Sequence, residues 1–481
     1  MPELLLGLDV GTSTVTACLF TPGGDLLGQA GARVRTQTPA PGRVEQDAEA
    51  IWRSTRTTIR RALAAAGRRA SDLAAIGVTS QRTSIVLWDR RGGRPLSPLV
   101  VWSDLRGAAR ASELQAAGYP LSAQQAAAKL EALWAQVPDR DALIAQGRLA
   151  WGNIDAFLIW KLSGGAAHVT DRSQAWPTGY LDLGTFGWNA GLIALQGLDE
   201  RAFPRLVDTW GDLARTHPSV LGAAVPIAAD IADQQAALIG QGAEAPGACK
   251  ITYGTSATVN VSTGDRFVYG GPTIPPFVLS SVNGQARFCI EGMVYSAGAA
   301  LDWLRHSFRL GGHARFEALA AATPDSRGVF VLPAFQGLGA PHGDLAARGA
   351  IGGLTLAAGP GEIARAGVEG AACRVREVVD HIYAQSGFER PAVLRADGGL
   401  TGSDVLMQAQ ADILGLPVAR HALREATACG AAICAGRGAG LLSPGDTSGF
   451  VRHDRTFDPA IGADEAATRF AAWRDRAYPG R

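Results

Sequence analysis

The sequence LLLGLDVGTSTVTACLF at residues 4–20 decides the fold, because two apolar runs flank a turn at Gly11-Thr12-Ser13. An apolar run, a turn of glycine and hydroxyl residues, and a second apolar run predict a β-hairpin. The stretch CKITYGTSATVNVSTG at residues 249–264 repeats this layout around Gly254-Thr255-Ser256. The offset between Gly11 and Gly254 is 243 residues, about half of the 481-residue chain. A repeat of this length predicts two related domains rather than the short units of a solenoid.

Around the two hairpins, strand and helix patterns alternate. We predict strands near residues 26–34 and 75–79, a hairpin around 89–94, and helices over about 47–66, from Pro360 onward and over 426–442. The last of these helices is rich in Ala and Gly, which lets another element approach it closely. Strands that alternate with helices predict an α/β protein with mixed sheets.

The segment GAEAPG at residues 242–247 is the predicted junction between the two domains, because Gly and Pro interrupt regular structure there. The predicted division is an N-terminal domain at residues 1–243, a C-terminal domain at 244–445, and a tail helix at 446–481 packed on these domains.

The composition excludes several classes of protein. The net charge is +1, which argues against a dedicated nucleic-acid or acidic-surface binder. Six cysteines in so long a chain form no disulfide framework, and their spacing shows no metal-ligand cluster. The first residues, MPELLLGLDV, lack a basic signal-peptide start, and no apolar run is long enough to span a membrane. We therefore expect a soluble cytoplasmic protein without membrane or nucleic-acid partners.

Three glycine-containing turns carry the chemistry. The first turn presents backbone N–H groups and hydroxyls that suit phosphate, and Asp9 beside it suits a hydrated Mg²⁺. The second turn, at Gly254, is suited to grip the same polyphosphate. Paired glycines after Asp397 let the backbone lie against a nucleotide. Each turn alone also fits a plain hairpin, but the three together are far more specific. The sequence contains neither a GxxxxGK[ST] P-loop nor the motif set of a protein kinase.

In this order, the turns resemble the two phosphate loops and the adenosine loop of the actin/Hsp70/hexokinase ATPase superfamily. The segments between and after them are similar to the FGGY carbohydrate kinases, and most of all to the glycerol kinase branch. These segments are Ile76–Arg82, Trp102-Ser103-Asp104-Leu105-Arg106, Gly152–Gly165, Asp233–Ala237, Gly337–Pro341 and Met407–Asp412. The resemblance covers nearly the whole chain. It implies two duplicated actin/ribonuclease H-like domains, with mixed sheets flanked by helices and a cleft between them.

The resemblance also implies an activity: ATP-dependent transfer of the γ-phosphate to a hydroxyl of a small polyol or sugar. Asp233 would be the catalytic base, although an aspartate before a helix is also a common N-cap. The implied substrate contacts are Arg82, Thr83, Trp102, Asp104, Asp233 and Gln234. The implied ATP contacts are Gly11, Thr12, Ser13, Thr14, Gly254, Thr255, Gly337, Gly398, Gly399 and Ser403. The implied Mg²⁺ site is formed by Asp9 and Asp233, and the implied assembly is a homodimer or homotetramer.

Some of these residues have a structural alternative. Trp102 fits a core aromatic equally well, Asp104 and Arg106 fit a surface ion pair, and Asp397 fits a turn cap.

Two departures from the glycerol kinase pattern concern the polyol grip. Thr83 stands where those kinases have a glutamate, and Ser122–Ala126 replaces a segment that contains a tyrosine. The second departure also includes Ala132, which stands where a tryptophan is expected after Lys129. These departures leave open a xylulokinase-like or tetritol/pentulose kinase of the same family. A nucleotide-binding regulator without sugar chemistry is a further alternative, disfavoured because Asp9 and Asp233 are both present.

Overall fold

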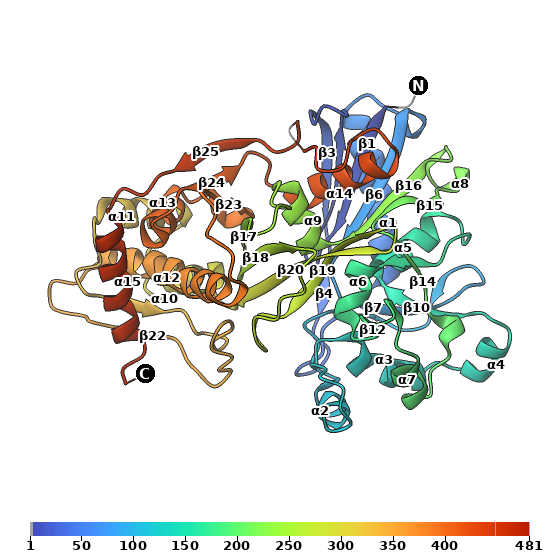
Figure 1. The fold of residues 1–481 in the computed structure, drawn as a ribbon, viewed down its shortest axis with the longest axis horizontal. Helices are drawn as coiled ribbons and strands as arrows, with labels where there is room; N and C mark the ends of the chain where they lie inside the picture. The colour runs from blue at the N-terminus through green and yellow to red at the C-terminus, as the bar shows by residue number, and fades with distance from the viewer. Residues whose placement is uncertain (1–2, 448, 481) are drawn as a thin grey trace. The chain divides into compact units, whose positions relative to one another are not determined.

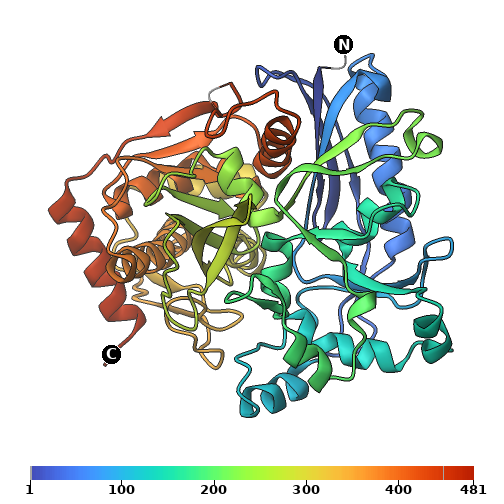
Figure 2. The same ribbon diagram turned by 45° about the vertical axis from the view of Figure 1, so that its right-hand side comes forward.

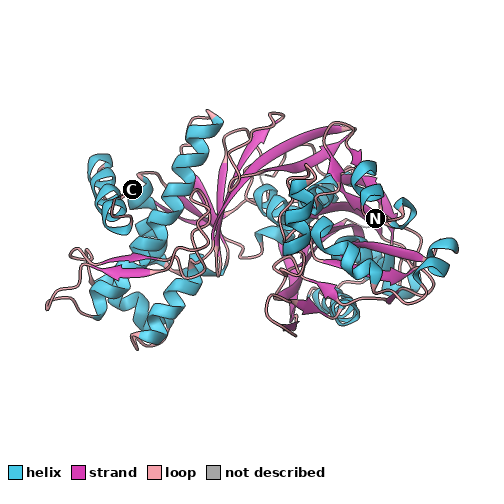
Figure 3. Ribbon diagram, turned by 90° about the horizontal axis from the view of Figure 1, so that it is seen from below, coloured by secondary structure: helices cyan, strands magenta, loops and turns pink. Residues whose placement is uncertain are grey.

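The computed structural model describes residues 3–447 and 449–480, so the outer ends of the predicted ranges lie outside it. The chain forms two compact units. Unit 1 comprises Met1–Gly240, Val278–Arg287 and Thr427–Phe450, and unit 2 comprises Gln241–Phe277, Phe288–Ala426 and Val451–Arg481. Each unit mixes strands and helices (Figure 3).

Unit 1 is built on a six-stranded sheet. The strand order is β15 (Trp210–Arg215), β16 (Pro226–Ala232), β6 (Leu73–Ser80), β1 (Leu4–Val10), β2 (Thr14–Phe20) and β3 (Leu26–Arg33). β1, β2 and β3 form an antiparallel meander, whereas β1, β6 and β16 run parallel (Figure 1). This confirms the predicted hairpin at residues 4–20 and the mixed sheet. Helix α1 (Ala48–Ala65) begins after Asp47, whose side chain accepts hydrogen bonds from the amides of Glu49 and Ala50.

A second sheet of unit 1 carries the segments that follow β3 and β6. Its order is β10 (Leu149–Asn153), β7 (Ile85–Asp89), β9 (Leu99–Val100), β5 (Glu45–Gln46) and β4 (Thr36–Gln37), and β8 (Arg94–Pro95) pairs with β7. The helices around it are α2 (Ala108–Ala116), α3 (Ala126–Ala135), α4 (Arg140–Ala145), α5 (Ile154–Leu162), α6 (Arg172–Ala175), α7 (Ala190–Leu195) and α8 (Pro218–Leu221). Short elements between them are η1 (Ala70–Asp72), β11 (Val169–Asp171), η2 (Trp176–Thr178), β12 (Leu181–Asp182), β13 (Gly187–Trp188), η3 (Glu200–Ala202) and β14 (Arg205–Val207).

Helix α14 (Ala426–Gly438) lies against the first sheet of unit 1 (Figure 1). A Cβ atom at Gly7 of β1 would lie 1.8 Å from the carbonyl oxygen of Ala428, and one at Gly77 of β6 would lie 2.0 Å from that of Ala431. Only glycine permits these approaches. This confirms the predicted close approach of an element to the Ala- and Gly-rich helix.

The compact units are composed differently from the predicted domains. The prediction placed residues 244–445 in one C-terminal domain, but the structure places Thr427–Phe450 with unit 1, together with Val278–Arg287. The reason is that helix α14 returns late in the chain to cover β1 and β6. The glycines on which α14 packs, Gly7 of β1 and Gly77 of β6, are more than 300 residues away from the helix along the sequence.

A seven-stranded sheet, which belongs to unit 2 except for the parts of β19 and β20 within Val278–Arg287, repeats the layout of unit 1. The order is β19 (Pro276–Val282), β20 (Gln285–Val294), β18 (Ala257–Gly264), β17 (Cys249–Tyr253), β23 (Leu394–Asp397), β24 (Val418–His421) and β25 (His453–Phe457). The hairpin β17–β18 corresponds to β1–β2, and β23 lies parallel beside β17 as β6 lies beside β1. The structure therefore confirms a duplicated architecture.

The helices of unit 2 include the one predicted from Pro360. That helix, α12 (Pro360–Ser386), buries Val368, Val375 and Val378 at helical spacing and ends at Gly387, which is left-handed with a φ of 69°. The remaining elements are α10 (Gly298–Ser307), α11 (His313–Ala322), β21 (Phe330–Leu332), β22 (Ala350–Gly352), η4 (Gly399–Gly402), α13 (Asp404–Leu414) and α15 (Ala463–Ala477). Helix α9 (Asp233–Gly240) belongs to unit 1.

The tail predicted as one helix at residues 446–481 is more varied. It first forms β25 at the edge of the sheet and then α15, as the end of the chain in Figure 2 shows. Helix α15 packs on α12, α13 and β21, and the Trp473 indole donates a hydrogen bond of 3.0 Å to the carbonyl of Val331. No helix among the described residues is long and apolar enough to cross a membrane.

Candidate active site

The first phosphate turn is closed by a hydrogen bond from the Gly11 amide to the Thr14 carbonyl, at 3.0 Å. Ser13 and Thr14 are exposed. The Thr12 hydroxyl donates to Gln81 Oε1 at 2.9 Å and accepts from the Trp102 indole at 3.1 Å. The Thr12 hydroxyl has one proton, and it donates that proton to Gln81. Thr12 can therefore meet a phosphate only through its backbone N–H, whereas Ser13 and Thr14 are exposed residues with hydroxyls.

Asp9 lies in β1, two residues before the turn, in register with Thr16 of β2 and Thr79 of β6. Carboxylate oxygens are hard ligands that suit Mg²⁺, which usually retains several waters and binds one or two carboxylates together with phosphates. No group of three or more His, Cys, Asp or Glu side chains in the described part of the chain forms a metal cluster. The Asp9 carboxylate beside this turn is a ligand of the type that Mg²⁺ takes.

The catalytic candidate Asp233 lies beside Arg82. Strands β6 and β16 are parallel neighbours that pair Ser80 with Ala232, so the residues just after them meet at the same edge of the sheet. Arg82 Nε lies 3.3 Å from Asp233 Oδ1, and both side chains are partly shielded, with exposed fractions of 13% and 25%. The Gln234 amide also donates to Asp233 Oδ1 at 2.8 Å. The Asp233 carboxylate thus has two partners, the Gln234 amide at the start of its own helix and the Arg82 guanidinium at the sheet edge.

Gln174 connects the two strands that lead to Arg82 and Asp233. This buried side chain donates from Nε2 to Ser80 Oγ at 2.9 Å and, over longer distances, to the carbonyls of Ser80 (3.4 Å) and Ile231 (3.3 Å). Sequence reasoning did not find Gln174, because nothing in its local sequence marks it as a link between strands 94 and 57 residues away.

Thr83 adopts a left-handed backbone with a φ of 53°, which is uncommon for a β-branched residue. Its carbonyl accepts a hydrogen bond of 3.4 Å from Lys129 Nζ, which also donates to the Val101 carbonyl at 3.2 Å. Lys129 is fully buried, and burial lowers its pKa to about 7, opposed by the nearby Asp104 carboxylate. Lys129 therefore stabilises the Thr83 turn through a hydrogen bond from the protein interior.

Trp102 is partly exposed, and Asp104 two residues later is fully buried. The Asp104 carboxylate accepts hydrogen bonds from the Val44 amide at 2.6 Å and from the Arg106 amide and guanidinium at 2.8–2.9 Å. Burial alone would raise the pKa of Asp104, but the hydrogen bonds from Arg106 lower it below its usual range. Asp104 and Arg106 do form an ion pair, but their side chains are shielded from solvent, so the alternative of a surface ion pair is wrong. Its contacts favour a role for Asp104 in holding the segment that carries Trp102.

The second phosphate turn lies in unit 2. The Gly254 amide donates to the Ser256 carbonyl at 2.8 Å, and Gly254 and Thr255 are exposed. The Gly254 carbonyl accepts from the Gly298 amide at 3.0 Å, at the start of α10, where a Cβ atom on Gly298 would lie 2.5 Å from that carbonyl oxygen. The N-terminus of α10 therefore borders the turn. Sequence reasoning missed Gly298, for which the signal is a glycine where a helix begins after a strand.

Gly398 joins the third glycine site to the second turn. Its φ is 94°, and a Cβ atom there would lie 2.3 Å from the Tyr253 carbonyl oxygen. Ser403 is the N-cap of α13 and accepts a hydrogen bond of 3.1 Å from the Leu406 amide. Neither buried carboxylate oxygen of Asp397 accepts a hydrogen bond among the described residues, so Asp397 does not cap its turn.

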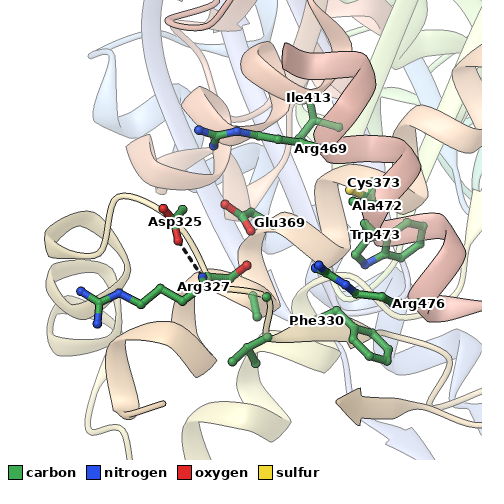
Figure 4. A pocket seen from close by; sticks show the side chains of 14 residues that line it. Asp325, Arg327, Phe330, Glu369, Cys373, Ile413, Arg469, Ala472, Trp473 and Arg476 are labelled. Atoms are coloured by element: carbon green, nitrogen blue, oxygen red, sulfur yellow. Dashed lines mark hydrogen bonds between the residues drawn. The ribbon is translucent and has the colours of Figure 1, made fainter. Parts of the chain in front are cut away.

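Gly337 lies elsewhere in unit 2, in the loop after β21, with a φ of 85°. The structure describes a separate cavity of about 260 Å³ in unit 2 between the start of β21 and α12, α13 and α15, with Phe330, Glu369, Trp473 and Arg476 in its wall (Figure 4). None of the predicted site residues lines this cavity.

Comparison with known proteins adds to this geometry. The model of the FGGY carbohydrate kinase N-terminal domain matches residues 4–240, and that of the C-terminal domain matches residues 249–439. The chain belongs to the FGGY family of carbohydrate kinases. The glycerol kinases of Symbiobacterium thermophilum and Aromatoleum aromaticum are 38% and 40% identical to this FGGY kinase, over 98% of its chain and 97% of theirs.

Solved structures agree with this assignment. Plasmodium falciparum glycerol kinase with ADP has a TM-score of 0.89 at 25% identity, covering 98% of this chain and 97% of that one. Rhodospirillum rubrum xylulose kinase has a TM-score of 0.83 at 26% identity, covering 99% of both chains. This FGGY kinase is a glycerol-kinase-like phosphotransferase with an alcohol group as acceptor. That finding favours a kinase over the alternative of a nucleotide-binding regulator.

Proposed function

We propose that this FGGY kinase transfers the γ-phosphate of ATP to a hydroxyl of a small polyol or sugar, with Asp233 as the general base. The observation that carries the proposal is the Arg82–Asp233 pair at the edge formed by β6 and β16. A carboxylate there can accept the hydroxyl proton while the substrate oxygen forms its bond to the γ-phosphorus. The bond between the γ-phosphorus and the bridging oxygen then breaks, and ADP leaves.

Other residues of unit 1 orient the acceptor. Arg82 holds the Asp233 carboxylate in place, and Gln234 and Thr83 lie next to these two residues along the chain. Trp102 has a partly exposed ring, and the buried Asp104 holds the backbone of the same segment through the Arg106 amide. Placing the hydroxyl before reaction is a main part of catalysis in phosphoryl transfer, because the protein supplies little covalent chemistry.

Phosphate recognition is proposed for both turns. The residues 11–14 and 254–255 expose backbone and hydroxyl groups, and Gly398, Gly399, Ser403 and Gly337 would border the adenosine. Asp9 and Asp233 would hold Mg²⁺, which offsets negative charge on the phosphates when bound. The proposed acceptor residues and the first turn lie within residues 1–243, and the second turn and the proposed adenosine loop lie within residues 244–445. A homodimer or homotetramer and a cytoplasmic location belong to the same proposal.

A polyol or ketose other than glycerol is the second candidate acceptor. Thr83 replaces the glutamate that glycerol kinases present, and its left-handed backbone and buried side chain leave one short hydroxyl at this place. Tetritols and pentuloses have additional hydroxyls that can replace the lost contact.

The testing experiment measures ADP release over glycerol, tetritols, pentitols and ketoses. Asp233→Asn is the variant that removes the base, and it should slow turnover of every acceptor at least about 10²-fold while ADP binding remains. Turnover at an undiminished rate after this substitution would refute the assignment of Asp233.

A further inference from the structure

Gln46, the last residue of β5, lies outside the motifs that indicate the site. Its side chain is 3% exposed and its amide is fully engaged. Nε2 donates to the Thr12 carbonyl at 2.7 Å and to Thr36 Oγ1 at 2.9 Å, and Oε1 accepts from Gln81 Nε2 at 2.9 Å. A buried amide with both donors and its acceptor in use has one defined orientation.

The bond to Thr12 sets the orientation of the first phosphate turn. In a trans peptide the carbonyl of one residue and the N–H of the next point in opposite directions. Gln46 holds the Thr12 carbonyl, so the Ser13 N–H must point away from Gln46. The Ser13 carbonyl is itself occupied by the Val34 amide at 2.9 Å. The exposed Ser13 amide meets no acceptor among the described residues.

The Thr12 hydroxyl reinforces this orientation. It lies between Gln81 and Trp102, and Gln81 also donates to Gln46, so Thr12, Gln46 and Gln81 form a closed ring of hydrogen bonds. A preoriented N–H is effective toward an anion because it needs no rearrangement when the charge arrives. The ring therefore prepares one donor of the turn for phosphate.

We propose that Gln46 is a positioning residue for nucleotide phosphate, acting through the Thr12–Ser13 peptide. The inference rests on the proposed function only in that the phosphate belongs to ATP or ADP. Its chemical requirement is a hydrogen-bond donor at Nε2. A side chain of the same shape that only accepts would place two oxygens against each other at Thr12 and turn the peptide away.

The test uses Gln46→Glu, which keeps the shape and removes the donor. Isothermal titration with ADP and magnesium chloride, without acceptor, should show binding weakened about tenfold or more at pH 8. Toward pH 6 the loss should shrink, because a buried introduced carboxyl takes up a proton at a raised pKa and then donates again. Gln46→Met should weaken binding at both pH values without this recovery. Melting temperatures measured alongside exclude unfolding as the cause.

Thr36→Val is the matched control, because it removes the other acceptor of Gln46 Nε2 and leaves the bond to Thr12. It should bind ADP within twofold of the unmodified protein. Gln46→Glu and Gln46→Met that bind ADP as tightly as the unmodified protein would overturn the inference, while turnover by the unmodified protein would leave the proposed function standing. An unmodified protein that phosphorylates no acceptor, with ADP affinity still lost in Gln46→Glu, would refute the function and support the inference.

Discussion

Arg82 Nε lies 3.3 Å from Asp233 Oδ1, although the two residues are 151 positions apart along the chain. They meet because Arg82 lies two residues after the end of β6 and Asp233 directly follows β16, and these strands are parallel neighbours. The pairing of Ser80 with Ala232 thus brings a cation and a carboxylate to one edge of the sheet. The proposed role of Asp233 as the general base depends on this pair.

Arg82→Ala should lower kcat/KM for the acceptor by about 10²-fold or more, because the Asp233 carboxylate loses the group that orients it. Steady-state kinetics at varied acceptor concentration measures the effect. Arg201→Ala, which removes an exposed partner of Asp199, is the control and should change neither kcat nor KM. Equal activity of Arg82→Ala and the control would contradict an orienting role for Arg82.

Gln174→Met should lower kcat, whereas the KM for ATP should change little. The substitution keeps the volume but leaves the carbonyls of Ser80 and Ile231 without their donor, at a cost of about 1–3 kcal/mol. The ends of β6 and β16 then lose a shared support beneath Arg82 and Asp233. Gln196→Met, another buried glutamine of unit 1, tests whether loss of stability alone has this effect. Matching kinetics in the two variants would show that Gln174 only stabilises the fold.

Lys129→Met should change how stability depends on pH. The folded pKa of Lys129 is about 7 against an ordinary value of 10.5, so the unfolded chain binds more protons between these values. The free energy of unfolding should therefore rise with pH over this window, by up to about 1.4 kcal/mol per pH unit from this group. Denaturant unfolding from pH 7 to 10 measures the slope in both proteins. Lys129→Met should lose this contribution, and identical slopes would contradict a neutral buried lysine.

Thr83→Glu should shift the acceptor preference toward glycerol. The substitution restores the carboxylate that glycerol kinases have at this place, where it can accept hydrogen bonds from polyol hydroxyls. The measurement is the ratio of kcat/KM for glycerol to that for the best tetritol or ketose, expected to rise about tenfold. Thr83→Gly, which suits the φ of 53° but adds no acceptor, should leave this ratio unchanged. A ratio that does not move in Thr83→Glu would show that specificity is determined elsewhere.

The sequence predicted the parts of the fold that local patterns encode. The hairpins around Gly11 and Gly254 and the helix from Pro360 follow from the periodicity and turn chemistry of a few neighbouring residues. The return of α14 to β1 could not be predicted from local patterns, because the packing of α14 against Gly7 joins residues more than 400 positions apart.

The candidate site divides in the same way. The turns and Asp233 are visible as motifs, whereas Gln46 and Gln174 act through single amides that reach distant strands. A buried glutamine has no local signature that distinguishes such a link from ordinary packing.

The most direct test of the central claim is ³¹P NMR of ATP with glycerol, tetritols, pentitols and ketoses, each with the unmodified protein and with Asp233→Asn. The account predicts that a phosphomonoester signal of at least one acceptor appears together with ADP, and that Asp233→Asn slows its formation at least about 10²-fold. Phosphorylation at an undiminished rate by Asp233→Asn, or ATP hydrolysis to inorganic phosphate with no phosphorylated acceptor, would contradict it.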